Sequence, residues 1–349
     1  MLKTPCYATQ SQTKQLEAYS ITRRNIGHKD ILIEIQFCGV CHTDLHYAKN
    51  DWGITKYPFV GGHEVIGLVK KFGTSVSGFD VDQRVAVGCF VNSCRTCSSC
   101  LNDLEQYCRG QLTKTYNDPT SDPGGHTFGG YSKYIVVDEH FVFTLPDNMN
   151  SAKSAPLLCA GITVFSPLNH WKVSRGMTVG IIGLGGLGHM AVKFSKALQA
   201  KTIVLTTSEG KVNDALMLGA DEVIVSSKQS EMEYAQNKFD FILNTIPVAH
   251  NVNNYMELLK VDGTMCVVGS IGPTGELNSR PLIFGRRNIS GSLVGGVNET
   301  QKMLDFCGLK NIQADVEIIQ LEQINEAYIR MKKNDVKYRF VVDMRSFGN

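Results

Sequence analysis

The first 150 residues contain short apolar runs separated by turn residues and polar loops. Residues 31–35 and 65–69 are two such runs, and both are rich in branched apolar side chains. Short runs of this kind between turn residues are typical of β-strands. The pattern therefore predicts a mostly β region with much loop.

From about residue 154 the pattern changes to an alternation of strands and helices. An apolar run at 177–182 is followed by a glycine loop, a helical period at 189–198 and a second apolar run at 202–205. This order is that of the βαβ unit, whose strands lie parallel. Further apolar runs continue the alternation, at 222–225, 239–243 and 265–268. The region predicts an α/β domain with a doubly wound parallel sheet, the Rossmann fold.

The length of the chain and its changes of pattern indicate two domains. At 349 residues the chain exceeds the roughly 250–300 residues at which a single core stops growing. Beyond residue 294 the pattern becomes helix and then strand, and it ends in a β-rich run at 338–342. We interpret this tail as a return to the first domain. The expected ranges are 1–153 for the first domain, 154–294 for the Rossmann domain and 295–349 for the return segment.

Composition narrows the possible classes of function. Charged residues make up 19% of the chain and hydrophobic residues 43%, with a formal net charge of +2, so we expect neither disorder nor a nucleic-acid-binding surface. No apolar stretch approaches the roughly 18 residues of a membrane span, and the first 20 residues lack the apolar core of a secretion signal. We therefore expect a cytoplasmic protein in a reducing compartment, where thiols stay free.

The glycine loop has the spacing G-x-G-x-x-G, formed by Gly183, Gly185 and Gly188 with Gly186 and Leu187 between them. An apolar run precedes it and a helical pattern follows. In this setting the glycines make a tight turn and let the backbone approach a pyrophosphate at the helix N-terminus. The loop therefore favours dinucleotide binding, and the alternative is a glycine-rich surface turn.

The end of the second predicted Rossmann strand bears on which dinucleotide binds. NAD-binding sequences usually place an acid there for the adenosine ribose, but this strand ends in Thr206, Thr207 and Ser208, with Lys211 close behind. Three hydroxyls and an ammonium group suit the 2′-phosphate, so we predict NADP(H) rather than NAD. The alternative is that the hydroxyls cap the next helix and that Glu209, one place late, does the work of the acid.

Four of the eleven cysteines lie in one short loop, as Cys94, Cys97, Cys100 and Cys108. Four thiolates close a tetrahedral zinc site and leave no coordination position open, so the loop predicts a structural zinc ion. The alternative is four unligated thiols in a polar loop, where they would be open to oxidation.

A second set of metal-ligating residue types is scattered along the chain. Cys41, His63 and Cys159 make up the Cys₂His ligand set of a catalytic zinc, which keeps a fourth position for water or substrate. Spacing alone supports this set only weakly, because a lone buried cysteine or histidine is commonly a packed core residue. The remaining cysteines are interpreted as such core residues: Cys6, Cys38, Cys89, Cys266 and Cys307.

Longer strings around these residues carry a family resemblance. GVCHTDLH, GGHEVIG, the four-cysteine loop ending in EQYC, LLCAGITV and GLGGLGHMAVK resemble, in this order, the zinc-dependent medium-chain dehydrogenases. Within them the chain is most similar to the cinnamyl alcohol dehydrogenase group and its microbial aldehyde-reductase relatives. The resemblance covers nearly the whole chain. It implies a mostly β, GroES-like catalytic domain into which the Rossmann domain is inserted, with the active site in the cleft between them.

The resemblance implies roles for residues around the catalytic metal. Cys41, His63 and Cys159 correspond to the zinc ligands, and Glu64 to a group that approaches or ligates the metal in some resting states. Asp44 corresponds to the carboxylate that orients the ligand histidine and so fixes the tautomer of its ring.

Thr43 and His46 correspond to the family's proton relay. Their offset of three residues places both on one helical face, and histidine exchanges protons near neutral pH. The expected activity is hydride transfer between NADP(H) and a primary alcohol or aldehyde, aromatic or aliphatic, in an enzyme with two zinc ions per chain that acts mainly as an aldehyde reductase.

The resemblance leaves the substrate open. It suggests as pocket-lining side chains Trp52, Phe90, Tyr116, Leu293 and Val294. Trp52 suits the core equally well. One alternative is a polyol or secondary-alcohol dehydrogenase of the same superfamily, although many polyol members lack the four-cysteine loop. Another is a non-catalytic, zinc-stabilised dinucleotide sensor, which would be expected to lose ligand residues. We expect a homodimer with a small-molecule substrate and with no nucleic-acid or membrane partner.

Overall fold

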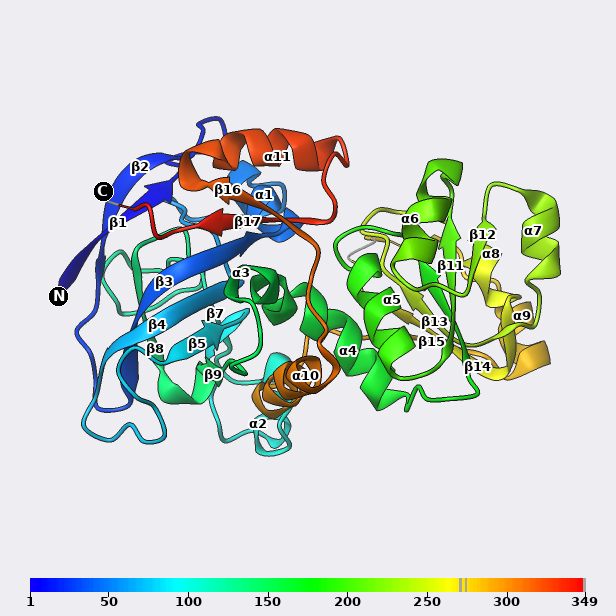
Figure 1. Cartoon of the computed structure of the whole chain (residues 1–349), viewed down its shortest axis with the longest axis horizontal. Helices are drawn as coiled ribbons and strands as arrows, with labels where there is room; N and C mark the ends of the chain where they lie inside the picture. Colours follow the sequence, from blue (N-terminus) through cyan, green and yellow to red (C-terminus); the bar gives the residue numbers. More distant parts are fainter. Residues whose placement is uncertain (270–271, 274, 348–349) are drawn as a thin grey trace. The chain divides into compact units, whose positions relative to one another are not determined.

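The computed structural model describes residues 1–269, 272–273 and 275–347, and the chain divides into two compact units (Figure 1). The first unit consists of Met1–Cys159 together with Gly295–Asn349, and the second of Ala160–Val294. The chain thus leaves the first unit once, forms the second and then returns.

A seven-stranded sheet forms the framework of the first unit. Its strands follow the order β16-β17-β3-β4-β5-β9, and β8 also pairs with β3. The β16–β17 pair is parallel and the other pairs are antiparallel. The strands are β3 (Asp30–Val40), β4 (Val65–Phe72), β5 (Arg84–Val87), β8 (Tyr134–Asp138), β9 (Phe143–Thr144), β16 (Val316–Gln320) and β17 (Arg339–Asp343). Two further two-stranded sheets join β1 (Leu2–Ala8) to β2 (Glu17–Arg23) and β6 (Phe90–Asn92) to β7 (Thr113–Lys114).

The long strand β3 anchors the core of this unit. Its apolar residues are almost all buried, and Ile31, Ile33 and Ile35 belong to one hydrophobic cluster. Because β17 pairs with β3 as far as Val40, the backbone that leads to the next residue, Cys41, is fixed by the sheet. The helices are α1 (His42–Lys49), α2 (Ser98–Leu101), α3 (Ser151–Ser154), α10 (Val297–Lys310) and α11 (Ile324–Lys332), and the 3₁₀ turns are η1 (Glu105–Tyr107), η2 (Glu139–Phe141), η3 (Ala155–Leu158) and η5 (Leu321–Gln323).

The second unit is a six-stranded, all-parallel sheet with helices between its strands. The strands are β10 (Thr178–Ile182), β11 (Lys201–Thr206), β12 (Glu222–Val225), β13 (Phe239–Asn244), β14 (Leu259–Val267) and β15 (Asn288–Gly291). The helices are α4 (Ala160–His170), α5 (Gly188–Ala197), α6 (Val212–Met217), α7 (Gln229–Tyr234), α8 (Asn253–Met256) and α9 (Ser279–Gly285), with the 3₁₀ turn η4 (Glu209–Lys211). Across both units, every helix in the described part of the chain is too short or too polar to cross a bilayer.

The strand order of this sheet, β12-β11-β10-β13-β14-β15, creates a switch point next to β10. From β10 the chain runs outward to β11 and β12, and it then returns to place β13 on the other side of β10. Ligands of open parallel sheets bind at the carboxyl ends of the strands at such a point. The glycine loop follows β10 directly and therefore lies there. The predicted fold class, a Rossmann sheet inserted in a mostly β unit, is confirmed.

Candidate zinc sites and cofactor loop

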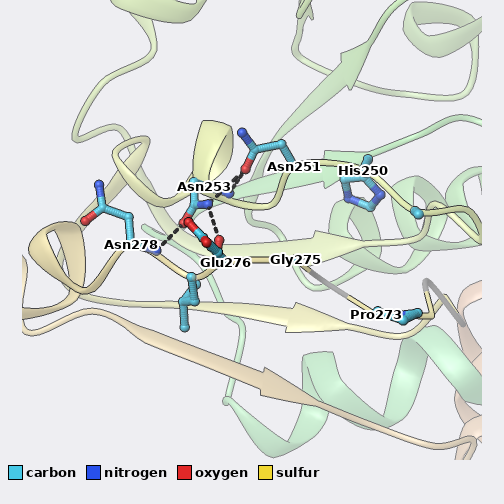
Figure 2. A pocket seen from close by; sticks show the side chains of 9 residues that line it. His250, Asn251, Asn253, Pro273, Gly275, Glu276 and Asn278 are labelled. Carbon is cyan, nitrogen blue, oxygen red and sulfur yellow. Dashed lines mark hydrogen bonds between the residues drawn. The ribbon is translucent and has the colours of Figure 1, made fainter.

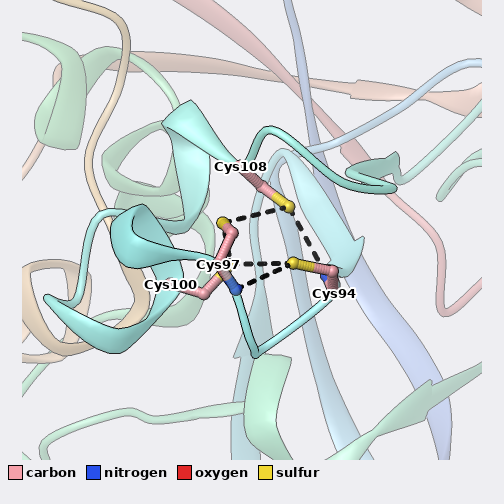
Figure 3. Close-up of side chains that lie close together, drawn as sticks. All are labelled: Cys94, Cys97, Cys100 and Cys108. Carbon is pink, nitrogen blue, oxygen red and sulfur yellow. Dashed lines mark hydrogen bonds between the residues drawn. The ribbon is translucent and has the colours of Figure 1, made fainter.

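The sulfur atoms of the four-cysteine loop lie close together around α2 and η1 (Figure 3). The Sγ atoms of Cys97 and Cys100 are 3.6 Å apart, those of Cys94 and Cys100 3.9 Å, and those of Cys97 and Cys108 4.0 Å. Sulfurs on a tetrahedral zinc with Zn–S bonds of about 2.3 Å would be about 3.8 Å apart. Backbone N–H groups of Thr96 and Cys97 lower the pKa of Cys94 to about 5, which favours the thiolate that binds metal. The geometry of the loop fits a zinc ion.

Glu105 ties this loop to the return segment of the chain. Its buried carboxylate accepts a hydrogen bond from the backbone N–H of Val297, the first residue of α10, at 3.0 Å, and lies 3.3 Å from Nε2 of His140. The side chain of Asn298 also donates to Asp103 at 3.0 Å. The fold of the loop is therefore coupled to the start of α10.

Cys41, His63, Glu64 and Cys159 form the second possible metal site, and all four are buried. One ligand atom from each lies within 4.8 Å of the others, and the two sulfurs are 3.9 Å apart. Three separate stretches supply them: Cys41 caps α1 directly after β3, His63 and Glu64 precede β4, and Cys159 follows η3. The structure thus brings together the residues that spacing alone supported only weakly.

Asp44 orients the residues of this group. Its fully buried carboxylate accepts hydrogen bonds from the backbone N–H groups of Cys41 at 2.8 Å and Gly62 at 3.0 Å, and from the hydroxyl of Tyr131 at 2.9 Å. Nδ1 of His63 lies 3.2 Å from the same carboxylate. A ligand histidine held through Nδ1 presents Nε2 to a metal. Tyr131, which the sequence analysis did not single out, is thus part of the support of the site.

Two of the suggested pocket residues contact histidines of the metal group or the relay. Tyr116 is 3% exposed, packs edge-on against Tyr47, and its hydroxyl lies 2.9 Å from Nδ1 of His63. Trp52 is 45% exposed and contacts the ring of His46, so it is not a core residue. The others differ in exposure: Phe90 is half-buried, Leu293 is exposed and Val294 is buried.

Arg339 is a charged neighbour of the group that the sequence did not indicate. Both it and Glu64 are buried, and Nη2 of Arg339 lies 3.1 Å from Oε1 of Glu64. This is an ion pair without hydrogen-bond geometry: neither carboxylate oxygen of Glu64, nor Nε of Arg339, has a hydrogen-bond partner among the described residues. Burial raises the pKa of Glu64 to about 7, against the opposing charge of Arg339. An unsatisfied buried carboxylate beside two thiols and an imidazole is a suitable donor set for zinc.

Thr43 and His46 both lie on α1, at the edge of this group. Oγ1 of Thr43 is 3.6 Å from Sγ of Cys41. Nδ1 of the partly exposed His46 lies 2.7 Å from a carboxylate oxygen of Asp51. When Nδ1 donates to Asp51, Nε2 of His46 stays available for proton exchange with water. Asp51 is a second neighbour that no sequence motif indicated.

The glycine loop after β10 is tightly folded and open on one side. Gly183 has a φ of +91°, which L side chains rarely adopt. A Cβ at Gly188 would lie 2.1 Å from the carbonyl oxygen of Gly183, whereas a Cβ at Gly185 would meet nothing within 4 Å. The loop therefore requires glycine for the turn and leaves free space at Gly185, while Gly186 and Leu187 lead into α5.

The end of β11 presents polar groups next to this loop. Nζ of Lys211 donates to the carbonyl oxygen of Leu184 at 3.1 Å, which brings its ammonium group to the glycine loop. Thr207 and Ser208 are exposed, and the backbone N–H of Ser208 donates to the hydroxyl of Thr206 at 3.2 Å. Ser208 precedes η4, but its side chain makes no capping hydrogen bond. The hydroxyl of Ser208 is therefore not used as a helix cap.

A hollow of about 900 Å³ lies at the same carboxyl edge of the second unit, beyond the glycine loop (Figure 2). The loops after β13 and β14 form it, and its lining residues are Ala249, His250, Asn251, Asn253, Pro273, Gly275, Glu276, Leu277 and Asn278. The ring nitrogens of His250 are engaged with Asn244 and the carbonyl of Val248, both at 2.8 Å. None of the lining residues belongs to the glycine loop or to the end of β11. Within the lining, Asn253 bonds to Asn251, Glu276 and Asn278.

Comparison with known proteins places these features in a family. Residues 27–147 match the model of the alcohol dehydrogenase GroES-like domain, and residues 186–308 match that of the zinc-binding dehydrogenases. The chain is 48% identical over 347 residues to aldehyde reductase YahK of Escherichia coli, with 99% of each chain covered. It is 46% identical over 341 residues to NADP-dependent alcohol dehydrogenase C 1 of Mycolicibacterium smegmatis, with 97% of each covered. Among solved structures, cinnamyl alcohol dehydrogenase SbCAD4 of Sorghum bicolor has a TM-score of 0.94 and 41% identity, over 99% of this chain and 98% of that one.

Proposed function

We propose a function for a chain that belongs to the zinc-dependent medium-chain alcohol dehydrogenases, in the cinnamyl alcohol dehydrogenase group. It transfers a hydride between NADP(H) and a primary alcohol or aldehyde and acts mainly as an aldehyde reductase. The observation that carries the proposal is the buried group of Cys41, His63, Glu64 and Cys159, whose ligand atoms converge within 4.8 Å. Thr43, at the edge of this group, adds a hydroxyl that can exchange a proton with the oxygen of an alcohol or aldehyde.

Cys41, His63 and Cys159 would hold a catalytic zinc ion, with Glu64 beside them as a further oxygen donor. When bound, the zinc ion supplies a Lewis acid that polarises a carbonyl group or lowers the pKa of an alcohol. Asp44 keeps His63 in the orientation and tautomer that binding requires, through its contact with Nδ1.

Thr43 and His46 would carry the proton that accompanies hydride transfer. The hydroxyl of Thr43 lies at the metal group and His46 lies one helical turn further along α1, where it is partly exposed. In aldehyde reduction the Thr43 hydroxyl would donate a proton to the oxygen of the substrate. His46 would pass a proton back toward Thr43 and then take a replacement from solvent. Asp51 holds the ring of His46 through Nδ1.

The second metal group, Cys94, Cys97, Cys100 and Cys108, would hold a structural zinc ion. Four thiolates leave no position for substrate, so the role of this ion is to stabilise the fold. The contacts of Glu105 with α10 extend that stabilisation to the return segment.

NADP(H) would bind at the carboxyl edge of the Rossmann sheet. The loop 183–188 would receive the pyrophosphate at the start of α5. The hydroxyls of Thr206, Thr207 and Ser208 with the ammonium group of Lys211 would bind the 2′-phosphate. The similarity to a mycobacterial alcohol dehydrogenase that is named as NADP-dependent supports this choice.

The oligomer would be a homodimer in the cytoplasm. β15 is an edge strand of the six-stranded sheet, and in the nearby helix α9 Ile283 and Phe284 are 73% and 79% exposed. A second copy that pairs with this edge would cover both the open strand and the apolar side chains. All eleven cysteines are free, which suits a reducing compartment.

A steady-state screen tests the proposal directly. Aromatic and aliphatic aldehydes, and the corresponding alcohols, are offered with NADPH or NADH to the zinc-loaded enzyme. Aldehyde reduction with NADPH should give the highest kcat/KM. Faster turnover of polyols or secondary alcohols would favour the alternative dehydrogenase class, and a preference for NADH would contradict the cofactor assignment.

A further inference from the structure

Lys228 and Glu209 form an ion pair at the end of β11, beside the proposed site for the 2′-phosphate. Nζ of Lys228 lies 2.6 Å from Oε1 of Glu209. Glu209 follows β11 and Lys228 follows β12, and these two strands are parallel neighbours in which Thr206 is opposite Val225. Their carboxyl ends therefore meet at the same edge of the sheet.

Hydrogen bonds beyond the strand ends hold the two segments side by side. The backbone N–H of Ser226 donates to the carbonyl of Thr206 at 2.8 Å, and the hydroxyl of Ser227 donates to the carbonyl of Thr207 at 3.4 Å. The segment 226–228 thus runs along the segment 206–208. The sheet therefore places the backbone of residue 228 beside the segment that carries the exposed hydroxyls.

Stability gives little reason for this pair. The side chain of Lys228 is 47% exposed and that of Glu209 is 70% exposed, and ion pairs in water contribute little to folding. Glu231 is a second acidic neighbour, with Oε1 3.4 Å from Lys228, but its other oxygen accepts a hydrogen bond from the backbone N–H of Val225 at 2.6 Å. Glu209 has the closer contact with Lys228.

The charge of Glu209 matters to the cofactor. A hydrogen bond from Lys228 lowers the pKa of Glu209, so this carboxylate is ionised at neutral pH. An unpaired acid near the end of the second strand accepts hydrogen bonds from the ribose hydroxyls of NAD and repels the phosphate of NADP. Glu209 has the chemistry for that role, and the alternative interpretation of the sequence gave it that role.

We propose that Lys228 is a specificity-determining residue, which neutralises Glu209 and so allows NADP(H) to bind in preference to NAD(H). The inference rests on the proposed NADP(H) function and extends it to a residue outside the glycine loop and the hydroxyl run. Lys211, whose ammonium group lies at Leu184, would bind the phosphate, while Lys228 would remove the repulsion that Glu209 would otherwise exert.

A double-mutant cycle separates this role from direct binding of the phosphate by Lys228. Dissociation constants for NADPH and NADH are measured by fluorescence titration for the wild type, Lys228→Gln, Glu209→Gln and the double variant, at low ionic strength. Lys228→Gln should weaken NADPH by about three- to tenfold, because the repulsion acts through water and is partly screened. NADH should bind as tightly as before or more tightly. In the double variant NADPH affinity should return to within about twofold of the value for Glu209→Gln.

Lys260→Gln is the matched control. It removes the same charge from a similar pair, with Asp240 at 2.7 Å, at the amino ends of β13 and β14. It should leave both dissociation constants unchanged.

The outcomes distinguish a failure of the proposed NADP(H) function from a failure of the role proposed for Lys228. A wild type that binds NADH better than NADPH overturns the proposed NADP(H) function. If the wild type prefers NADPH, an unchanged NADPH constant in Lys228→Gln overturns the role of Lys228. A loss that persists in full in the double variant also overturns it, because Lys228 would then act on the phosphate itself and not through Glu209.

Discussion

The buried pair of Arg339 and Glu64 provides a quantitative test of how the catalytic metal group is stabilised. Arg339→Met removes the guanidinium group and keeps most of the side-chain volume. Glu64 then loses the guanidinium group 3.1 Å away, so above its pKa of about 7 it must either stay ionised without that partner or bind a proton. The side chains are 6% and 0% exposed, so solvent screens the pair little. Loss of one partner of a buried ion pair costs about 3–5 kcal/mol.

Thermal unfolding measures this loss, at alkaline pH and with the group of Cys41, His63, Glu64 and Cys159 kept free of zinc, so that no metal ion compensates the charge of Glu64. For a unit of this size each kcal/mol corresponds to about 2–4 °C in Tm, so Arg339→Met should lower Tm by roughly 6–20 °C. The double variant Arg339→Met/Glu64→Gln removes both charges and should recover most of the loss. Arg345→Met is the control, because Arg345 also pairs with an acid of β17 but its side chain is 58% exposed. Its effect should stay within about 1 kcal/mol.

Two results would refute this reasoning. A Tm for Arg339→Met within about 4 °C of the wild type would show that the guanidinium group does not stabilise a buried charge. A double variant as unstable as the single one would show that the cost comes from lost packing of Arg339 and not from an unpaired Glu64.

Three further predictions concern the zinc groups and the relay. Cys100→Ser should lower zinc content from about two ions per chain to about one and reduce thermal stability. Metal analysis and thermal unfolding measure the two effects, and full metal content would exclude a zinc site in that loop. Cys159→Ser should abolish turnover. It should leave NADPH affinity within about twofold of the wild-type value, because Cys159 and the glycine loop belong to different units. Near-normal turnover by the zinc-depleted variant would contradict the mechanism. His46→Ala should slow alcohol oxidation more at low pH than at high pH, where bulk base replaces the relay; an unchanged pH profile of kcat would count against that role.

Features confined to one stretch of chain could be predicted from the sequence. The apolar runs at 177–182, 202–205 and 222–225 agree with β10, β11 and β12 to within one residue. The run at 239–243 likewise agrees with β13, but β14 is harder to predict. The run at 265–268 marks only the end of β14, because Lys260 and Asp262 interrupt the apolar pattern of its first half. The four-cysteine loop and the glycine loop could also be predicted, because all the functional atoms of each loop lie within one short segment of the chain.

Features that depend on contacts between distant segments could not be predicted in this way. Arg339 reaches the metal group because β17 pairs with β3 in a register that places Phe340 opposite Val40, next to Cys41. No local pattern encodes that register. Likewise Lys228 meets Glu209 only because β12 lies beside β11. The scattered ligands Cys41, His63 and Cys159 could be assigned to one metal site only from the family resemblance, because their spacing alone supports that assignment weakly.

The charges of the catalytic metal group give a physical reason for its dependence on metal. Two carboxylates and two thiols are buried with one guanidinium group and one imidazole. A hydrogen bond with Cys159 lowers the pKa of Cys41 well below its usual value, and hydrogen bonds with Cys41 and Cys89 raise the pKa of Cys159 well above it, so that without metal Cys159 keeps its proton. A zinc ion replaces this proton and adds two positive charges, and its binding must therefore release protons. Zinc affinity at this site should consequently rise with pH, as long as Cys159 keeps its proton in the metal-free protein. The buried Arg339, the first residue of β17, balances part of the same negative charge through its interactions with Glu64, Cys41 and Cys159.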